Sequence, residues 1–523
     1  MRIIRTIFLA INVLLFCLTV NAQQNSKTFV HIEHADHQVY DESFGKNVER
    51  LVGNVVLRHD STYFYSDSAH FNEKTRYFDG YGNVHIKVND TTDIYSDKCK
   101  YSGDTKFAEL FDNVILKDDS TTLKTNYMTY DRNKHLATYP RRGSITRNDK
   151  NLVSHKGYYR DDIQTAYFRT DVVVTTPHSR MLTDTLEYRI KDEKMFFFGP
   201  TTIYYDDYVL EGNYGWYDAK NDIAYLDRRA TLSNKGYSIT ADTMVYKRKI
   251  EFAQAKSNVF VHDTVNKAIL EGNYSEMWKK LGKTFVTDSA RMRYYGDRDT
   301  LYQHSDTLFF FMDTLTNKAE RILSYYNVRF YRNDIQGKCD SLSYLVSDST
   351  AKMRGNPMIW AENSQLRGDS INIVIANKAI DSVLLYPNGF IIQKDTIEGF
   401  NQIKGKVMTA YFKKNELDHV YDDGNAETVY WLREEDGSMI GINVSQSVAM
   451  DIKIRKNQIV RIKYFKKTTE TLYPKEKLKP GAEILKGFEW REELRPTGPT
   501  DIFRKETKVV EENVKGRRKG RRK

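Results

Sequence analysis

The 523-residue sequence has few cysteines and few prolines. Its three cysteines, Cys17, Cys99 and Cys339, are too few for the disulfide framework of small secreted folds. A single bridge between Cys99 and Cys339 stays open, beside the simpler interpretation that both are small apolar fillers. Nine prolines permit long regular elements, because proline interrupts the hydrogen bonding of strands and helices.

The sequence also lacks the common catalytic signatures. It contains no Gly-x-Ser-x-Gly, no His-Glu-x-x-His and no phosphate-binding loop. The segment 31–37 holds three histidines and two acids, but His31 and His34 would point to opposite faces of a strand. We therefore predict a polar edge strand there, with no metal site, no cofactor and no enzymatic activity.

Long apolar runs are confined to the N-terminus. Arg2 and Arg5 precede an apolar stretch that ends in small residues at Ala22. This pattern predicts a secretory signal peptide over residues 1–22 and an exported, soluble protein. Cys17 follows the bulky Phe16, which argues against a lipoprotein cysteine. In a cell with two membranes, the predicted location is the periplasm.

The net charge of +10 is concentrated at the chain ends. The tail 515–523 and the N-terminal arginines carry most of it, so the rest of the chain is close to neutral. A nucleic-acid site needs basic residues along a face. The sequence therefore predicts no nucleic-acid partner, and leaves the tail either solvated or in peripheral contact with anionic lipid head groups.

Two short patterns recur about every thirty residues. The first is Asn followed by alternating apolar residues, as at Asn54, Asn83, Asn113 and Asn258. The second is Asp followed by small and aromatic residues two and four positions later, as in Asp67-Ser-Ala69-His-Phe71. Alternation with period two is typical of strands with one buried face. We interpret the repeated Asp as a structural residue where a strand begins after a turn.

With 36 tyrosines and 26 phenylalanines, the composition also favours strands. Turn-rich connectors such as 88–92 and 116–120 separate the patterns. A unit of thirty residues cannot bury its apolar face alone, but stacked units can. The sequence thus predicts an all-β, elongated repeat protein built from stacked units of about thirty residues.

The stretch from about Val30 to Tyr130 resembles the OstA-like family. The matching segments are Gly53-Asn54-Val55, Asp67-Ser68-Ala69 with Phe71, and Gly82-Asn83-Val84. The best-known relatives are periplasmic lipopolysaccharide-transport bridge proteins and organic-solvent-tolerance proteins. The resemblance implies a β-taco, or β-jelly-roll, whose two walls hold lipid acyl chains.

The resemblance also implies a site and partners. Lipid A and lipopolysaccharide are the implied ligands, and other transport proteins would pair with exposed edge strands, with self-association left open. The protein would assist lipopolysaccharide transport across the periplasm and association with the outer membrane. The predicted lipid-binding inner face consists of Val55, Leu57, Ala69, Phe71, Val84, Ile86, Cys99, Tyr101, Val114, Leu116, Met128 and Tyr130.

The predicted organisation has four parts. A signal peptide (1–22) precedes an N-terminal OstA-like β-repeat domain (23–260) and a second β-repeat region (261–465), which continues the stack. An irregular C-terminal segment (466–523) is rich in Pro and Gly and ends in the basic tail; its apolar residues from Leu485 to Trp490 would pack back on the last unit.

Two alternative functions stay open. A β-solenoid scaffold or adhesin with a dry core would have the same alternation, because apolar residues also pack one wall on the other. A carbohydrate-active β-helix enzyme is less favoured, since the chain shows no local concentration of acids and bases.

Overall fold

A computed structural model describes residues 29–296, 299–377, 379–395, 397–413, 416–434, 436–455 and 458–505. The predicted signal peptide and the basic tail lie outside the described residues. The chain divides into two compact units, residues 1–221 (unit 1) and 222–523 (unit 2). The sequence-based division at 260/261 stays a prediction.

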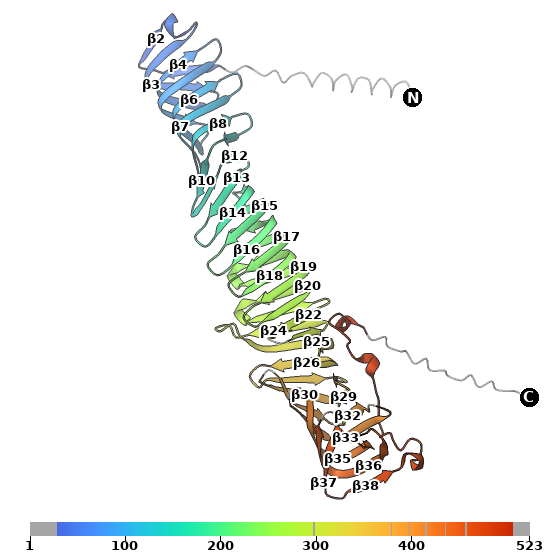
Figure 1. The fold of residues 1–523 in the computed structure, drawn as a ribbon. Helices are drawn as coiled ribbons and strands as arrows, with labels where there is room; N and C mark the ends of the chain where they lie inside the picture. Colours follow the sequence, from blue (N-terminus) through green and yellow to red (C-terminus); the bar gives the residue numbers. More distant parts are fainter. Residues whose placement is uncertain are drawn as a thin grey trace, which may run out of the picture. The chain divides into compact units, whose positions relative to one another are not determined.

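Both units consist of antiparallel strands that follow one another in chain order (Figure 1). The strands of unit 1 are β1 Val30–His34, β2 His37–Tyr40, β3 Glu49–His59, β4 Thr62–Asn72, β5 Tyr77–Lys87, β6 Thr92–Ser102, β7 Phe107–Asp118, β8 Thr121–Asp131, β9 Leu136–Tyr139, β10 Gly143–Arg147, β11 Lys150–Ser154, β12 Lys156–Arg160, β13 Thr165–Thr175, β14 Arg180–Arg189, β15 Lys194–Tyr204 and β16 Val209–Asp218.

The strands of unit 2 are β17 Ile223–Ser233, β18 Tyr237–Lys247, β19 Phe252–Asp263, β20 Ala268–Trp278, β21 Lys283–Thr287, β22 Arg291–Tyr295, β23 Thr300–His304, β24 Thr307–Met312, β25 Ala319–Arg332, β26 Ile335–Leu345, β27 Thr350–Arg354, β28 Met358–Ala361, β29 Ser364–Arg367, β30 Ser370–Ala376, β31 Ala379–Tyr386, β32 Gly389–Lys394, β33 Phe400–Gly405, β34 Val407–Lys413, β35 Glu416–Arg433, β36 Met439–Arg455, β37 Gln458–Phe465 and β38 Thr469–Tyr473.

Helical structure is limited to short 3-10 turns in the part of the chain that the structure describes. These are η1 Glu42–Phe44, η2 Arg248–Ile250, η3 Lys279–Leu281, η4 Lys475–Lys477, η5 Glu492–Leu494 and η6 Asp501–Phe503. The predicted fold class, an all-β stack of repeating units, is therefore confirmed.

Most long strands bend sharply near their middle. In β5, the two residues at the bend, Gly82 and Asn83, have φ values of +71° and +44°. The pairing of β5 with β4 and with β6 shifts register at this point. Two left-handed residues in succession turn the strand through a corner, so that each strand contributes to two walls.

A side-chain pair repeats at these corners. The Asn83 side-chain amide donates to Asp67 of the preceding strand over 3.0 Å, and Asn113 donates to Asp97 over 2.7 Å. A Cβ atom at position 82 would lie 2.3 Å from the Asp67 carboxylate, so a side chain there would require that carboxylate to shift; the equivalent positions of two other corners hold Asp112 and Ser257. The same bond joins Asn54 to Asp36, Asn258 to Asp242, Asn327 to Asp306 and Asn388 to Asp369.

The repeated Asp is structural, and its predicted position at a strand start holds for Asp306 and Asp369, which directly precede β24 and β30, but not for Asp67. Asp67 lies in the middle of β4 and not at its start. The preceding Ser66 completes the corner, because its hydroxyl donates to the carbonyl of Ser68. Sequence spacing could not reveal this arrangement, since one bent strand and two short strands have the same alternation.

The corners divide unit 1 into two walls, which we call the first arm and the second arm. Over β3 to β8, the first arm contains residues 55–59, 62–66, 84–87, 92–96, 114–118 and 121–125, and the second arm contains residues 49–52, 68–72, 77–81, 98–102, 107–111 and 127–131. The hairpin turns of the two arms lie opposite the corners, at a side that we call the mouth.

Unit 2 repeats this architecture and adds an outer layer. Its interior holds a large apolar cluster that includes Val328, Leu366, Ile391 and Ile452. The segment 474–505, which we call the strap, runs over the outer face of the β28–β29–β32–β33 wall. Leu485, buried, and Phe488 and Trp490, partly buried, pack there in a second apolar cluster. Residues 485–490 thus return onto the sheet as expected, but they pack over β32, β33, β35 and β36 and not on the last strands alone.

Candidate functional site

The predicted inner-face residues all point into the interior of unit 1. They come from six consecutive strands, β3 to β8, and none is more than 3% exposed. The twelve are Val55, Leu57, Val84, Ile86, Val114 and Leu116 on the first arm, and Ala69, Phe71, Cys99, Tyr101, Met128 and Tyr130 on the second. The structure thus brings all of them to one continuous apolar interior, while lipid contact at these residues stays a prediction.

Aromatic rings join the two arms inside this interior. The Phe64 ring of the first arm lies 5.1 Å from the Phe78 ring and 4.5 Å from the Tyr101 ring, centroid to centroid; both partners belong to the second arm. Such edge and tilted contacts are favourable for aromatic pairs. The inner faces therefore touch here, and a hydrocarbon chain would enter only if the arms moved apart.

Polar side chains close the mouth above these rings. Tyr101 and His59 share a hydrogen bond of 2.7 Å, and Arg132 donates to the Tyr101 hydroxyl over 2.7 Å. Lys106 of the second arm pairs with Asp60 of the first arm over 2.7 Å. We call these five residues the latch, because they join the turns of the two arms.

Burial changes the ionisation of the latch. It raises the pKa of the Tyr101 hydroxyl to about 12, although the nearby Arg132 opposes this shift. Burial also lowers the pKa of His59, with Asp60 acting in the opposite direction. Neutral Tyr101 and neutral His59 suit the interior, because a buried charge without a partner is costly.

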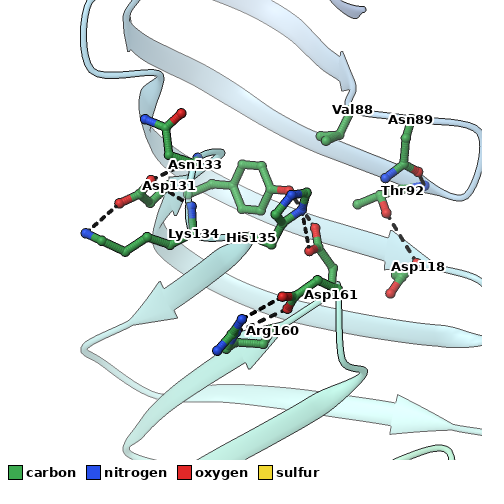
Figure 2. Close-up of polar contacts among 12 residues, drawn as sticks. Val88, Asn89, Thr92, Asp118, Asp131, Asn133, Lys134, His135, Arg160 and Asp161 are labelled. Carbon is green, nitrogen blue, oxygen red and sulfur yellow. Dashed lines mark hydrogen bonds and ion pairs between the residues drawn. The ribbon is translucent and has the colours of Figure 1, made fainter. Parts of the chain in front are cut away.

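A second set of polar contacts lies farther along the mouth. The Tyr159 hydroxyl of β12 donates to Asp118, which also accepts from Thr92 over 3.2 Å. Asp161 accepts from Tyr130 over 2.5 Å and pairs with His135 over 3.0 Å. Figure 2 shows Thr92 beside Asp118, and His135 beside Asp161. Each buried carboxylate thus has polar partners, as burial requires.

Sequence reasoning missed the latch and the ring contacts of Phe64. Phe64 has the inward parity of Leu57, its cross-strand partner, so alternation could have identified it. The latch had no such signal, because Lys106 and Asp60 are 46 residues apart and lie in turns.

The two cysteines are buried and free, so the disulfide alternative was wrong. Burial raises the pKa of both thiols, that of Cys339 to about 12. Within the described residues, no group of three or more His, Cys, Asp or Glu side chains is arranged to hold a metal ion. No helix in the described parts of the chain is long and apolar enough to cross a membrane.

Comparison with known proteins gives one family and one structural likeness of interest. Residues 27–184 match the model of the family described as OstA-like protein, in agreement with the resemblance seen in the sequence. The crystal structure of LptH from Pseudomonas aeruginosa, described as the LptA homologous periplasmic component of the conserved lipopolysaccharide transport device, aligns with 11% identity, a TM-score of 0.22, and coverage of 27% of this chain and 95% of that chain. No curated protein matches the chain.

Proposed function

We propose that this chain, whose residues 27–184 match the OstA-like family, is an exported envelope protein that binds lipopolysaccharide by its acyl chains and assists its transport to the outer membrane without catalysing a reaction. The observation that supports this most is the continuous apolar interior of unit 1, lined by consecutive strands and bounded by a mouth. Hydrocarbon that replaces water on such a surface gains about 25 cal/mol per Å².

The proposed binding requires the mouth to open. The latch ties the arms through the hydrogen bond between Tyr101 and His59, a bond from Arg132 to the carbonyl of His59, and ion pairs of Asp60 with Lys106 over 2.7 Å and with Arg132 over 3.7 Å. The partly exposed pair of Asp60 with Lys106 contributes only about 0–1 kcal/mol, so the outer part of this closure is one that a lipid could displace. Acyl chains would then lie between Phe64 on one arm and Phe71 and Tyr101 on the other.

The terminal strands are the proposed docking edges. In unit 1, β1 and β2 pair with β3, and in unit 2, β37 and β38 pair with β36. All four residues of β2 are exposed, as are four of the five in β38. Edge strands with free backbone groups pair with strands of other chains, so related transport proteins or a second copy would bind there.

The main alternative is a structural scaffold with a dry core. The contact between Phe64 and Tyr101 across the interior favours it, because the packed rings leave no room for a ligand while the arms stay closed.

Photo-crosslinking separates the two functions. A photoreactive residue at Phe71 faces the interior, and one at the neighbouring His70 faces outward on the same strand as a matched control. With purified lipopolysaccharide, the proposed function gives a lipid adduct at position 71 and not at 70. A folded protein that gives no adduct at 71 or at Tyr101 would establish the scaffold instead.

A further inference from the structure

A cavity of about 1000 Å³ lies in unit 2, between the strap and the corner ends of the underlying strands. We call it the strap pocket. The strands contribute Arg329, Lys338, Arg367 and Lys404, and the strap contributes Lys486, Arg491, Arg504 and Lys505. A volume of this size suits a small ligand or a headgroup better than a macromolecular surface.

Positive charge dominates the lining. Eight basic side chains face three carboxylates, those of Asp369, Glu489 and Glu493. Each carboxylate already has a partner: Asp369 accepts from Asn388 over 2.9 Å, and Arg491 lies 3.8 Å from Glu489 and 3.5 Å from Glu493. Two of the cations also pair with carboxylates outside the lining, Lys404 with Glu427 over 3.2 Å and Arg504 with Asp501 over 3.3 Å. The cations that remain in excess attract an anion into the pocket.

The guanidinium groups are held in place by the protein. Arg329, only 4% exposed, donates to the carbonyl of Leu494 over 3.1 Å. Arg367 donates to the carbonyl of Gly487, pairs with Glu489 over 3.3 Å and lies 5.0 Å from the Phe390 ring centroid. The Arg367 Nε atom is buried and has no hydrogen-bond partner. A buried donor without a partner is costly and suits a ligand that accepts from it.

We propose that the strap pocket binds a phosphate-bearing anion through its arginine and lysine side chains. Fixed guanidinium forks match the geometry of phosphate oxygens. Burial disfavours the charge on Arg367 and lowers its pKa, against the influence of Glu489, and a bound dianion reverses that penalty. A phosphorylated lipid headgroup and a free phosphate compound share this chemistry. The headgroup assignment rests on the proposed function, whereas the anion site depends only on the residues of unit 2.

Calorimetric titration of the full-length protein with inorganic pyrophosphate tests the site. The variant combines Lys486→Gln and Lys505→Gln, because both lysines are exposed, line the pocket and make no hydrogen bond or ion pair with the described residues. Its strap therefore keeps its contacts. The matched control combines Lys124→Gln and Lys352→Gln, two exposed lysines outside the pocket.

We expect pyrophosphate to bind the parent protein at low salt, and the pocket variant to bind roughly fivefold more weakly for each lysine removed. The control should bind like the parent, and added salt should weaken binding in both. Absence of pyrophosphate binding by the parent, or an equal loss in the control, would overturn the proposal.

A second titration identifies the source of the phosphate. Phosphatidylcholine vesicles carry a phosphorylated glycolipid in one sample and its dephosphorylated form in the other. Binding to the phosphorylated vesicles alone, in competition with pyrophosphate, supports a headgroup. Binding of pyrophosphate without vesicle binding supports a free phosphate compound and removes the headgroup assignment. Crosslinking at Phe71 does not involve the strap pocket. Failure of the proposed lipid binding in unit 1 can therefore be distinguished from failure of the anion site in unit 2.

Discussion

Units 1 and 2 use the same bent strands but cover them differently. In unit 1 the burial of β5 and β6 largely alternates, and the outer residues meet solvent. In unit 2 all four residues of β28 are buried, because the strap packs on the outer face while the interior cluster packs on the inner face. One repeat pattern therefore supports both a single-layered and a strapped wall.

The difference extends to how the walls are held together. Unit 1 joins its arms at the mouth by the latch, which consists of side chains from turns and from the adjoining strand ends. Unit 2 holds the strap on one wall through buried glutamines: Gln365 donates to the carbonyl of Glu489 over 2.7 Å, and Gln402 donates to that of Glu483 over 2.8 Å. His59 and Tyr101 of the latch are as buried as the two glutamines, which are 0–2% exposed, but the latch pair of Lys106 with Asp60 is partly exposed. Water replaces such an exposed pair more readily than a buried hydrogen bond, so unit 1 is better suited to open at its mouth than unit 2 is to lose its strap.

Replacing Tyr101 gives the largest expected loss of stability and tests this contrast from the side of unit 1. Tyr101→Ala removes a fully buried ring and the centre of the latch, at an expected cost of about 3–5 kcal/mol in the free energy of unfolding. Hydrogen exchange read by mass spectrometry should show lost protection in unit 1 and unchanged protection in unit 2. Tyr101→Phe, the matched control, keeps the ring and should cost about 1–2 kcal/mol. Equal loss of hydrogen-exchange protection in both units would mean that unit 1 does not open more readily than unit 2.

Asp422 provides a second test, in the interior of unit 2, where a buried carboxyl group makes stability depend on pH. This residue is fully buried, and neither carboxylate oxygen has a hydrogen-bond partner. Burial, followed by the charges of Asp423 and Glu427, raises its pKa from 3.8 to about 8. Between these two values the folded state keeps a proton that the unfolded state has lost. Stability is therefore full below the lower value and falls as the pH rises through this window.

Asp422→Asn should remove this pH dependence. We expect a variant that is more stable than the parent at pH 8 by a few kcal/mol, at about 1.4 kcal/mol for each pKa unit, and little changed at pH 4. Urea unfolding followed by tryptophan fluorescence at both pH values measures the difference. A variant that keeps the slope of the parent would show that Asp422 does not hold the proton.

The strap gives the smallest of the three effects. Phe488→Ala removes a partly buried ring that lies 5.2 Å from Phe400, centroid to centroid, so about 2 kcal/mol should be lost. The loss should appear as faster hydrogen exchange in β33 and the strap, with unit 1 unaffected. Lys352→Gln, an exposed change on β27, serves as the control. If β33 keeps its protection against hydrogen exchange in the variant, the strap adds little to the stability of unit 2.

Alternation was the part of the fold that the sequence could predict well. The inward positions of Ala69, Phe71, Cys99 and Tyr101 follow from period two, because each residue on a strand reverses face. The corner was seen as a repeat of Asn and Asp but was placed at strand starts. Left-handed residues inside a strand leave the alternation of inward and outward residues intact on both sides. The alternation therefore gives no sign of where a strand bends.

Contacts between distant segments were not predictable in the same way. The strap pocket joins Arg329, Lys404 and Arg491, and the neutral charge of the chain body concealed this local excess of cations. The latch likewise unites turns whose composition is ordinary for surface loops. Both depend on which segments meet in space, and a single sequence carries no direct record of that.

The corner pair has a consequence for how such a chain can change length. Each Asn bonds to the Asp of the strand before it, so Asn83 uses Asp67 and Asn113 uses Asp97. A tandem duplication of residues 68–97 would supply one new amide and one new carboxylate, and every partner would again be matched. A duplication that contained only Asn83 or only Asp97 would leave one of them unmatched. Changes in length that keep every corner pair therefore add or remove one Asn together with one Asp.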